Sequence, residues 1–210
     1  MTKTSCLVVA VLAVLALRPA VSMAHDPASH DAAMEAQGQP SGRSIYNLDE
    51  AWTTQEGVTA PLAALSGKPV VAAMGYTTCR DICPAIVADM MWIEKHLPVG
   101  AADQVRFAFF SLDSEVDSPE RLRLYAESHG LDTTRWTLLR ARDDDTVREL
   151  AAALGVAYRP DGRGGFDHAA VLSLLNSRGE IVFQQRGTQS SSDELLAALK
   201  SLLEMGNQIR

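Results

Sequence analysis

The fold of this chain is decided by the stretch VVAAMGYTTCRDICPAIVADM, residues 70–90, in which an apolar run passes into a helical pattern. Residues 70–74 are apolar at every position, which is typical of a strand buried on both faces of a sheet. In residues 84–97 large apolar side chains recur at spacings of four, three and four, which predicts a helix with one buried face. Cys79 and Cys83 lie at the junction, and ligands of α/β sheets bind at the ends of strands.

The rest of the chain continues this alternation. Apolar runs predict further strands at residues 105–112, 136–140, 169–175 and 181–185. Start and stop signals predict three more helices: Ser118 and Pro119 begin one that Gly130 ends, another ends at Gly155, and the capping box SSDE at residues 191–194 begins the last. The turn NSRGE, residues 176–180, joins the last two strands as an antiparallel hairpin. We therefore predict an α/β domain of thioredoxin-like fold, with a central mixed sheet, helices on both faces, and a C-terminal hairpin plus helix.

Residues 1–24 have the three parts of a cleavable signal peptide. Lys3 supplies a positive start, CLVVAVLAVLAL at residues 6–17 is apolar, and SMA at residues 22–24 offers small residues for cleavage. The apolar run of about 12 residues is shorter than the roughly 20 that a bilayer needs, so cleavage is favoured over an uncleaved anchor. Residues 25–44 have no steady period and are predicted to be a flexible tail, which leaves residues 45–210 as the folded domain.

The chain is acidic. Its formal charge is −7, and cleavage after residue 24 removes two positive charges and no acidic residue, which leaves −9. Such a surface argues against nucleic acid as a partner. Cleavage also removes Cys6, so Cys79 and Cys83 remain as the thiols of the predicted exported protein. In that setting a cysteine pair serves as a disulfide, a redox couple or a metal site.

Cys79 and Cys83 are four residues apart, which places both side chains on one face of a helical turn and within reach of a disulfide. The free N–H groups at a helix start favour thiolate over thiol, and Arg80 adds a positive charge, so the pair is expected to be reactive. Three uses are open. A structural disulfide would close a loop too short to stabilise the chain much. Thiol–disulfide exchange usually has two intervening residues, where this pair has three. A metal ion would need a further ligand.

The histidines are the candidates for that ligand. His96 and His129 lie near the ends of predicted helices and are expected to be surface residues or C-terminal cations. His168 is placed differently, because it follows a glycine-rich loop at residues 162–165 and precedes a predicted strand. In a thioredoxin-like layout this loop lies beside the start of the helix that follows the cysteines. His168 is therefore the candidate third ligand.

Together these residues resemble the Sco/SenC family of copper-handling proteins, over residues 45–206. The segments that carry the resemblance are LSGKPVVAAMGYTTCRDICP (65–84), FAFFSLDSEVDSPERLRLYAESHG (107–130) and FDHAAVLSLLNSRGEI (166–181). The resemblance implies a thioredoxin-like fold and a copper site made by Cys79, Cys83 and His168. It also implies a role in delivering copper to the dinuclear copper site in subunit II of cytochrome c oxidase, or in reducing the cysteines of that site.

The donor types agree with copper. Two soft thiolates and an imidazole suit Cu(I) in a three-coordinate site, and Cu(II) with an added oxygen donor. Zn²⁺ would need a fourth ligand, and none stands out. Asp81 is expected to cap the helix rather than to bind the ion. Asp167 is a weaker candidate, as a residue that orients His168.

The sequence departs from the family in three respects. Arg80 stands where proline is usual, Ala169 follows the histidine where serine or threonine is usual, and a cleavable signal replaces the common membrane anchor. The last departure predicts a soluble periplasmic protein. His25, His30 and Met34 place further donors near the predicted new N-terminus, although a tail without a specific ligand is the favoured interpretation.

The sequence thus predicts a periplasmic copper metallochaperone that binds one copper at Cys79, Cys83 and His168. The expected recipient is the dinuclear copper site of cytochrome c oxidase or another copper-receiving protein. Two alternatives stay open. One is a thiol–disulfide reductase with Cys79 and Cys83 as its catalytic residues, and the other is a copper or redox sensor.

Overall fold

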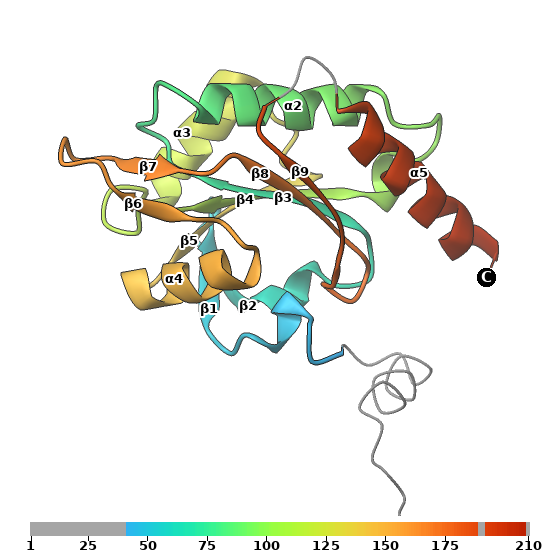
Figure 1. Cartoon of the computed structure of the whole chain (residues 1–210), viewed down its shortest axis with the longest axis horizontal. Helices are drawn as coiled ribbons and strands as arrows, with labels where there is room; N and C mark the ends of the chain where they lie inside the picture. The colour runs from blue at the N-terminus through green and yellow to red at the C-terminus, as the bar shows by residue number, and fades with distance from the viewer. Residues whose placement is uncertain (1–40, 189–191, 209–210) are drawn as a thin grey trace, which may run out of the picture.

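The computed structural model describes residues 41–188 and 192–208. Nine strands and four α-helices follow one another in this part of the chain (Figure 1). The strands are β1 (Ala51–Thr54), β2 (Thr59–Pro61), β3 (Val70–Gly75), β4 (Arg106–Ser111), β5 (Trp136–Ala141), β6 (Tyr158–Pro160), β7 (Phe166–His168), β8 (Val171–Leu175) and β9 (Ile181–Arg186). The helices are α2 (Cys83–Lys95), α3 (Pro119–His129), α4 (Asp144–Ala153) and α5 (Asp193–Gln208), with short 3-10 helices η1 (Ile45–Asn47), η2 (Leu62–Leu65) and η3 (Ala102–Gln104).

Seven strands form one mixed sheet in the order β2-β1-β5-β4-β3-β8-β9. Strand β3 lies between β4, which runs parallel to it, and β8, which runs antiparallel. Strands β8 and β9 form the antiparallel hairpin that the turn at residues 176–180 predicted. Strands β6 and β7 pair with each other in a separate two-stranded sheet. The predicted mixed sheet, C-terminal hairpin and final helix are therefore confirmed.

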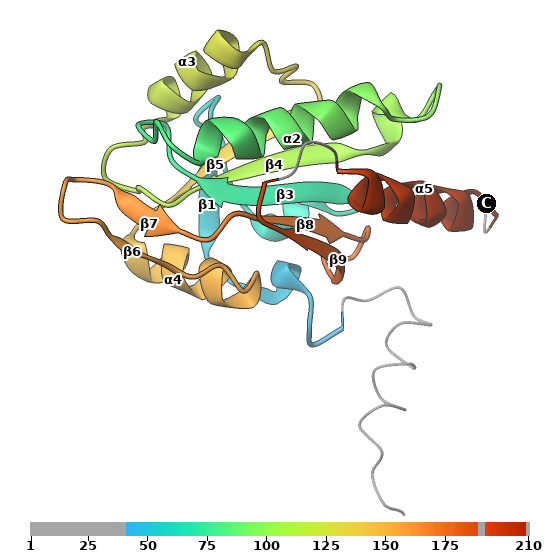
Figure 2. The same ribbon diagram turned by 45° about the horizontal axis from the view of Figure 1, so that its top comes forward.

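Strand β3 divides the interior into two cores, because successive side chains of a strand point to opposite faces. Val71 and Ala73 pack with the buried sides of α2, α3 and α5. Val70, Ala72 and Met74 pack on the other face, with α4, η1 and η2. Figure 2 shows α2 and α3 above the sheet and α4 below it. The prediction of helices on both faces is confirmed.

Helix α3 begins and ends where its capping signals predicted. Ser118 is the N-cap, and its hydroxyl accepts a hydrogen bond from the N–H of Arg121. Gly130 ends the helix in the left-handed conformation, which glycine adopts without a steric penalty. The first residue of the capping box predicted before α5, Ser191, lies outside the described residues.

Helix α2 differs in detail from the prediction. It begins one residue earlier, at Cys83, and ends two residues earlier, at Lys95. Its N-cap is Ile82, and no side chain caps its first turn. The prediction that Asp81 caps this helix is therefore wrong.

Four short strands were not predicted from the sequence. Strands β1 and β2 extend the sheet beyond β5. Strands β6 and β7 have three residues each, which is too short to show a period. As a result His168 ends a strand of its own, and the strand predicted from residue 169 begins only at Val171.

Residues 41–44, which the sequence assigned to the tail, contact the turn between β8 and β9. The N–H of Ser41 donates to Oε1 of Glu180 at 3.1 Å, and the hydroxyl of Ser44 donates to the carbonyl of Arg178. Residues 1–40 lie outside the described part, and with them the predicted signal peptide and the donors His25, His30 and Met34. No helix within the described residues combines the length and the hydrophobicity that crossing a membrane requires.

Candidate metal centre

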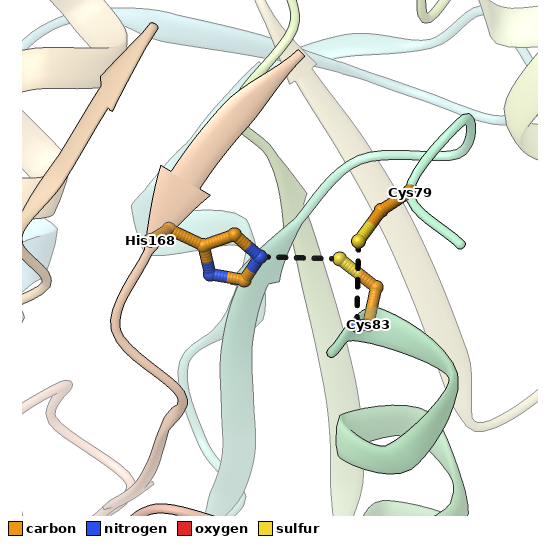
Figure 3. A group of neighbouring side chains, drawn as sticks. All are labelled: Cys79, Cys83 and His168. Atoms are coloured by element: carbon orange, nitrogen blue, oxygen red, sulfur yellow. Dashed lines mark hydrogen bonds between the residues drawn. The ribbon is translucent and has the colours of Figure 1, made fainter. Parts of the chain in front are cut away.

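Three side chains from separate segments meet at one end of the sheet. Cys79 lies in the loop after β3, Cys83 is the first residue of α2, and His168 is the last residue of β7 (Figure 3). The two sulfurs and one imidazole nitrogen all lie within 4.8 Å of one another. The Nε2 atom of His168 is 3.2 Å from Sγ of Cys83. The structure thus brings together the three residues that the sequence singled out as ligands.

The sulfur of Cys79 is surrounded by backbone N–H groups from the start of α2. The N–H of Cys83 donates to it at 3.5 Å, and the N–H groups of Asp81 and Ile82 contribute as well. Burial alone would raise the pKa of Cys79, but these donors outweigh burial and hold the pKa below its ordinary value. Cys79 is largely buried, with 9% of its surface exposed. Arg80 is exposed at the surface beside it.

Cys83 lies deeper and has no exposed surface. Burial, together with the hydrogen bond and charge of Cys79, raises the pKa of Cys83 above its ordinary value. The surroundings of Cys79 therefore favour the thiolate, as expected for both residues, whereas those of Cys83 disfavour it. Gly75 makes room for this sulfur, because a Cβ atom there would lie 2.9 Å from Sγ of Cys83 and 2.8 Å from the ring of Phe109.

His168 faces the sulfurs as a partly buried imidazole. Burial lowers the pKa of His168, against the opposing effect of its contact with a backbone carbonyl, so the ring is neutral at pH 7. Its Nδ1 lies 3.2 Å from the carbonyl oxygen of Ala169, which assigns the proton to Nδ1 and leaves Nε2 as the ligand atom. Asp167 instead forms an ion pair with Arg159 at 3.1 Å, so the prediction that Asp167 orients the imidazole is wrong.

His96 and His129 lie at the C-terminal ends of α2 and α3, as predicted. The Nδ1 of His96 is 2.8 Å from the carbonyl oxygen of Trp92, and the Nδ1 of His129 is 3.0 Å from that of Tyr125. Neither imidazole belongs to the group of donors around the cysteines.

Two residues that the sequence did not single out hold the cysteine loop in place. The buried carboxylate of Asp117 accepts hydrogen bonds from the hydroxyl of Ser111 at 2.6 Å and from the N–H and hydroxyl of Thr77 at 3.1 and 2.5 Å. The hydroxyl of Tyr76 is hydrogen-bonded to the backbone of Phe166. A buried carboxylate such as that of Asp117 is rarely found without hydrogen-bond partners. No sequence pattern marks Asp117 as buried, so sequence reasoning could not find it.

The spacing and the chemistry of the donor set both suit a metal ion. Two ligands of one ion, each about 2.0–2.3 Å from it, lie at most about 4.6 Å apart, which is close to the separation found. Among the described residues no fourth His, Cys, Asp or Glu joins the group, so a closed zinc tetrahedron is not formed. Two thiolates and one imidazole fit Cu(I), or Cu(II) with an added donor.

The fold and the site together define a thioredoxin-like protein with a candidate metal centre of two cysteines and one histidine. The family model described as SCO1/SenC matches residues 42–204. The chain therefore belongs to the SCO1/SenC family.

Individual relatives agree with this assignment. The chain is 27% identical to the SCO1 protein homolog of Bacillus subtilis (strain 168) over 150 residues, which cover 70% of this chain and 77% of the relative. It is 27% identical to the structure of Bradyrhizobium japonicum ScoI with copper bound, with a TM-score of 0.61 and coverage of 73% of this chain and 96% of that one. BsSco, a member of the Sco family of cytochrome c oxidase assembly proteins, shares the fold at 24% identity, with a TM-score of 0.65 and coverage of 75% and 94%.

Proposed function

We propose that the protein is a copper metallochaperone that binds one copper ion through Cys79, Cys83 and His168 and delivers it to a partner protein. The observation that carries the proposal is the meeting of two sulfurs and one imidazole nitrogen within 4.8 Å of one another. Copper is the metal that best suits this donor set. The similarity to a ScoI protein solved with copper bound supports the same choice.

The chain's own groups prepare the site for a metal cargo. The N–H donors around Cys79 stabilise its thiolate, and the neutral imidazole of His168 presents Nε2. Cys83 holds its proton more firmly, so metal binding releases a proton from this thiol. A site with three donors from the protein keeps room for a ligand of the partner, which transfer by ligand exchange requires.

The partner that we propose is the dinuclear copper site of cytochrome c oxidase subunit II, or another copper-receiving protein. Membership of the SCO1/SenC family supports this choice. We further propose that residues 1–24 direct export to the periplasm and are then removed, which leaves a soluble protein without an anchor. N-terminal sequencing of the protein from a periplasmic extract should find His25 first, and a retained Met1 in a membrane fraction would contradict this part of the proposal.

Copper binding is tested on the chain from residue 25 to residue 210. Cu(I) is titrated in competition with a chromophoric chelator, for wild type, Cys79→Ser, Cys83→Ser and His168→Ala. Loss of either sulfur should abolish tight binding, and His168→Ala should weaken it by at least about tenfold, or about 1.4 kcal/mol. His129→Ala is the matched control, because its imidazole lies outside the group of donors. Wild-type affinity in all three site variants would overturn the proposal.

A thiol–disulfide reductase is the second candidate, and the unequal thiols favour it. A thiol of lowered pKa next to a more deeply buried thiol of raised pKa is the arrangement of an attacking and a resolving cysteine. In one turnover the Cys79 thiolate would attack a partner disulfide, and Cys83 would then displace the partner's dithiol. The two electrons would come from the cysteine pair, which would end as the Cys79–Cys83 disulfide.

The two functions differ in their dependence on His168. Single-turnover reduction of a disulfide-containing peptide should be retained in His168→Ala if the reductase activity is the main one. Copper affinity should fall in the same variant if the chaperone activity is the main one. If His168→Ala reduces the peptide rapidly and binds copper with wild-type affinity, the reductase function would replace the chaperone function.

A further inference from the structure

The hairpin that carries His168 is built apart from the main sheet. Strands β6 and β7 pair with each other, while the other seven described strands form their own ladder. Ladder hydrogen bonds to the seven-stranded sheet therefore do not set the position of this hairpin. The short connection to β8 anchors one end of the hairpin, and side-chain contacts fix how the rest of it lies against the cysteines.

Tyr76 makes such a contact from the cysteine side. It directly follows β3, three residues before Cys79, and it is only 6% exposed. Its hydroxyl donates to the carbonyl oxygen of Phe166 at 3.2 Å and accepts from the N–H of Phe166 at 3.1 Å. Both backbone groups of the residue two positions before His168 are thus held by one phenol.

The ring of Tyr76 adds packing to these hydrogen bonds. It lies edge-on to the ring of Phe166, with centroids 5.5 Å apart, and edge-on to the imidazole of His168, with centroids 6.0 Å apart. A Cβ atom at Gly165 would lie 2.8 Å from the Tyr76 hydroxyl, so the glycine allows the hairpin backbone to approach it. The contact thus depends on the phenol of Tyr76 on the cysteine side and on Gly165 and Phe166 on the hairpin side.

We propose that Tyr76 is a positioning residue that holds the imidazole of His168 against the sulfurs of Cys79 and Cys83. The inference rests on the proposed copper site and adds the element that assembles it. Tyr76 acts through Phe166, whose backbone engages its proton and an oxygen lone pair, and its hydroxyl also interacts with the thiol of Cys79. Without the hydroxyl, the hairpin loses this anchor, and the imidazole of His168 occupies its binding position for less of the time.

Tyr76→Phe removes the hydroxyl and keeps the ring. Tyr46→Phe is the matched control, because the Tyr46 hydroxyl is buried and has no hydrogen-bond partner among the described residues. In Tyr76→Phe, amide hydrogen exchange at Phe166 measured by NMR should accelerate by at least about tenfold, since its N–H loses its acceptor. Cu(I) affinity should fall by about 10–100-fold, as for other residues that orient a ligand. The nitrogen splitting in the EPR spectrum of the Cu(II) form should weaken.

The double variant Tyr76→Phe/His168→Ala separates positioning from general stability. If Tyr76 acts through the histidine, its removal should cause no further loss of copper affinity once His168 is absent. Gly165→Ala provides a second route, because it crowds the hydroxyl without removing it and should show the same histidine-dependent loss even where Tyr76→Phe does not fold.

Three results would overturn the inference. One is unchanged exchange at Phe166 in Tyr76→Phe. Another is an equal loss of affinity with and without His168. The third is a phenolate-to-Cu(II) charge-transfer band that disappears in Tyr76→Phe, which would make Tyr76 a ligand. If His168→Ala binds copper as tightly as wild type does, the proposed copper site fails. The amide exchange rate at Phe166 then still decides whether Tyr76 holds the hairpin.

Discussion

The Sγ atom of Cys83 lies 3.2 Å from Nε2 of His168, although the two residues are 85 positions apart in the chain. The cysteine is held at the first residue of α2, and the histidine is held at the end of a hairpin outside the main sheet. The site therefore depends on how the cysteine loop, the start of α2 and the hairpin are packed. Each of these parts can be disturbed separately.

The two thiols should differ in reactivity. Cys79 has a lowered pKa and a small exposed surface, whereas Cys83 has a raised pKa and no exposed surface. Because the thiolate is the nucleophile, iodoacetamide at pH 7 should modify Cys79 at least about tenfold faster, which corresponds to one pKa unit. Peptide mass spectrometry measures the two rates, with Cys83→Ser keeping the fast phase and Cys79→Ser losing it. Equal rates would show that the environments of the two sulfurs do not differ as described.

Gly75→Ala should destabilise the protein. The added Cβ would lie 2.8 Å from the ring of Phe109 and 2.9 Å from Sγ of Cys83, in a region where both neighbours are buried. Overpacking of this kind costs about 1–3 kcal/mol. Gly42→Ala is the control, since nothing lies within 4 Å of its Cβ position, and it should change the free energy of unfolding by less than about 0.5 kcal/mol. Urea denaturation of the two variants compares them, and equal stability would contradict the close approach at Gly75.

Asp117 should make stability depend on pH. Burial raises the pKa of Asp117, although its hydrogen bonds with Ser111 and Thr77 act in the opposite direction. The folded pKa lies above the unfolded value of 3.8, so the stability that Asp117 contributes is fully present below 3.8 and is lost as the pH rises through the folded pKa.

Asp117→Asn should remove this loss, because the amide does not titrate. Urea denaturation from pH 4 to pH 8 should show the stability of wild type falling relative to that of the variant as the pH rises. Asp81→Asn, at an exposed position beside the cysteines, controls for the loss of one negative charge. A constant difference between wild type and Asp117→Asn across this range would count against a raised pKa.

Glu180 should stabilise the protein at neutral pH. Burial would raise the pKa of Glu180, but hydrogen bonds with Asn176, Ser41 and Arg178 lower it to about 2. The folded pKa is depressed, so this stability is present above the unfolded value of 4.5 and is lost as the pH falls through about 2. Glu180→Gln should cost about 1–3 kcal/mol at pH 7, because charged hydrogen bonds are lost. Thermal unfolding should show the difference shrinking towards pH 2, with the exposed Glu56→Gln as control.

Much of the fold was predictable because several local signals point the same way. The run at residues 70–74 is apolar because β3 faces a core on each side. Helix α3 begins at the hydroxyl cap of Ser118 and ends at Gly130, where the absence of a Cβ permits the left-handed conformation. Strands β6 and β7 were missed because three residues cannot show a period, and their place depends on contacts with distant residues.

The candidate site was predictable only in part. The spacing of Cys79 and Cys83 and the family resemblance identified the three side chains that meet. Both thiols lie near the start of a helix and were expected to behave alike, whereas their unequal burial makes them different. The contacts of Thr77 with Asp117 and of Tyr76 with Phe166 join residues 40 and 90 positions apart, and no local pattern carries such information.

The unequal burial of the candidate ligands would set the order in which their bonds to a transferred ion break. His168 is partly exposed and Cys79 is 9% exposed, whereas Cys83 has no exposed surface. An acceptor approaching from solvent would therefore replace the more exposed ligands of a bound ion first, and the bond to the sulfur of Cys83 would be the last to break.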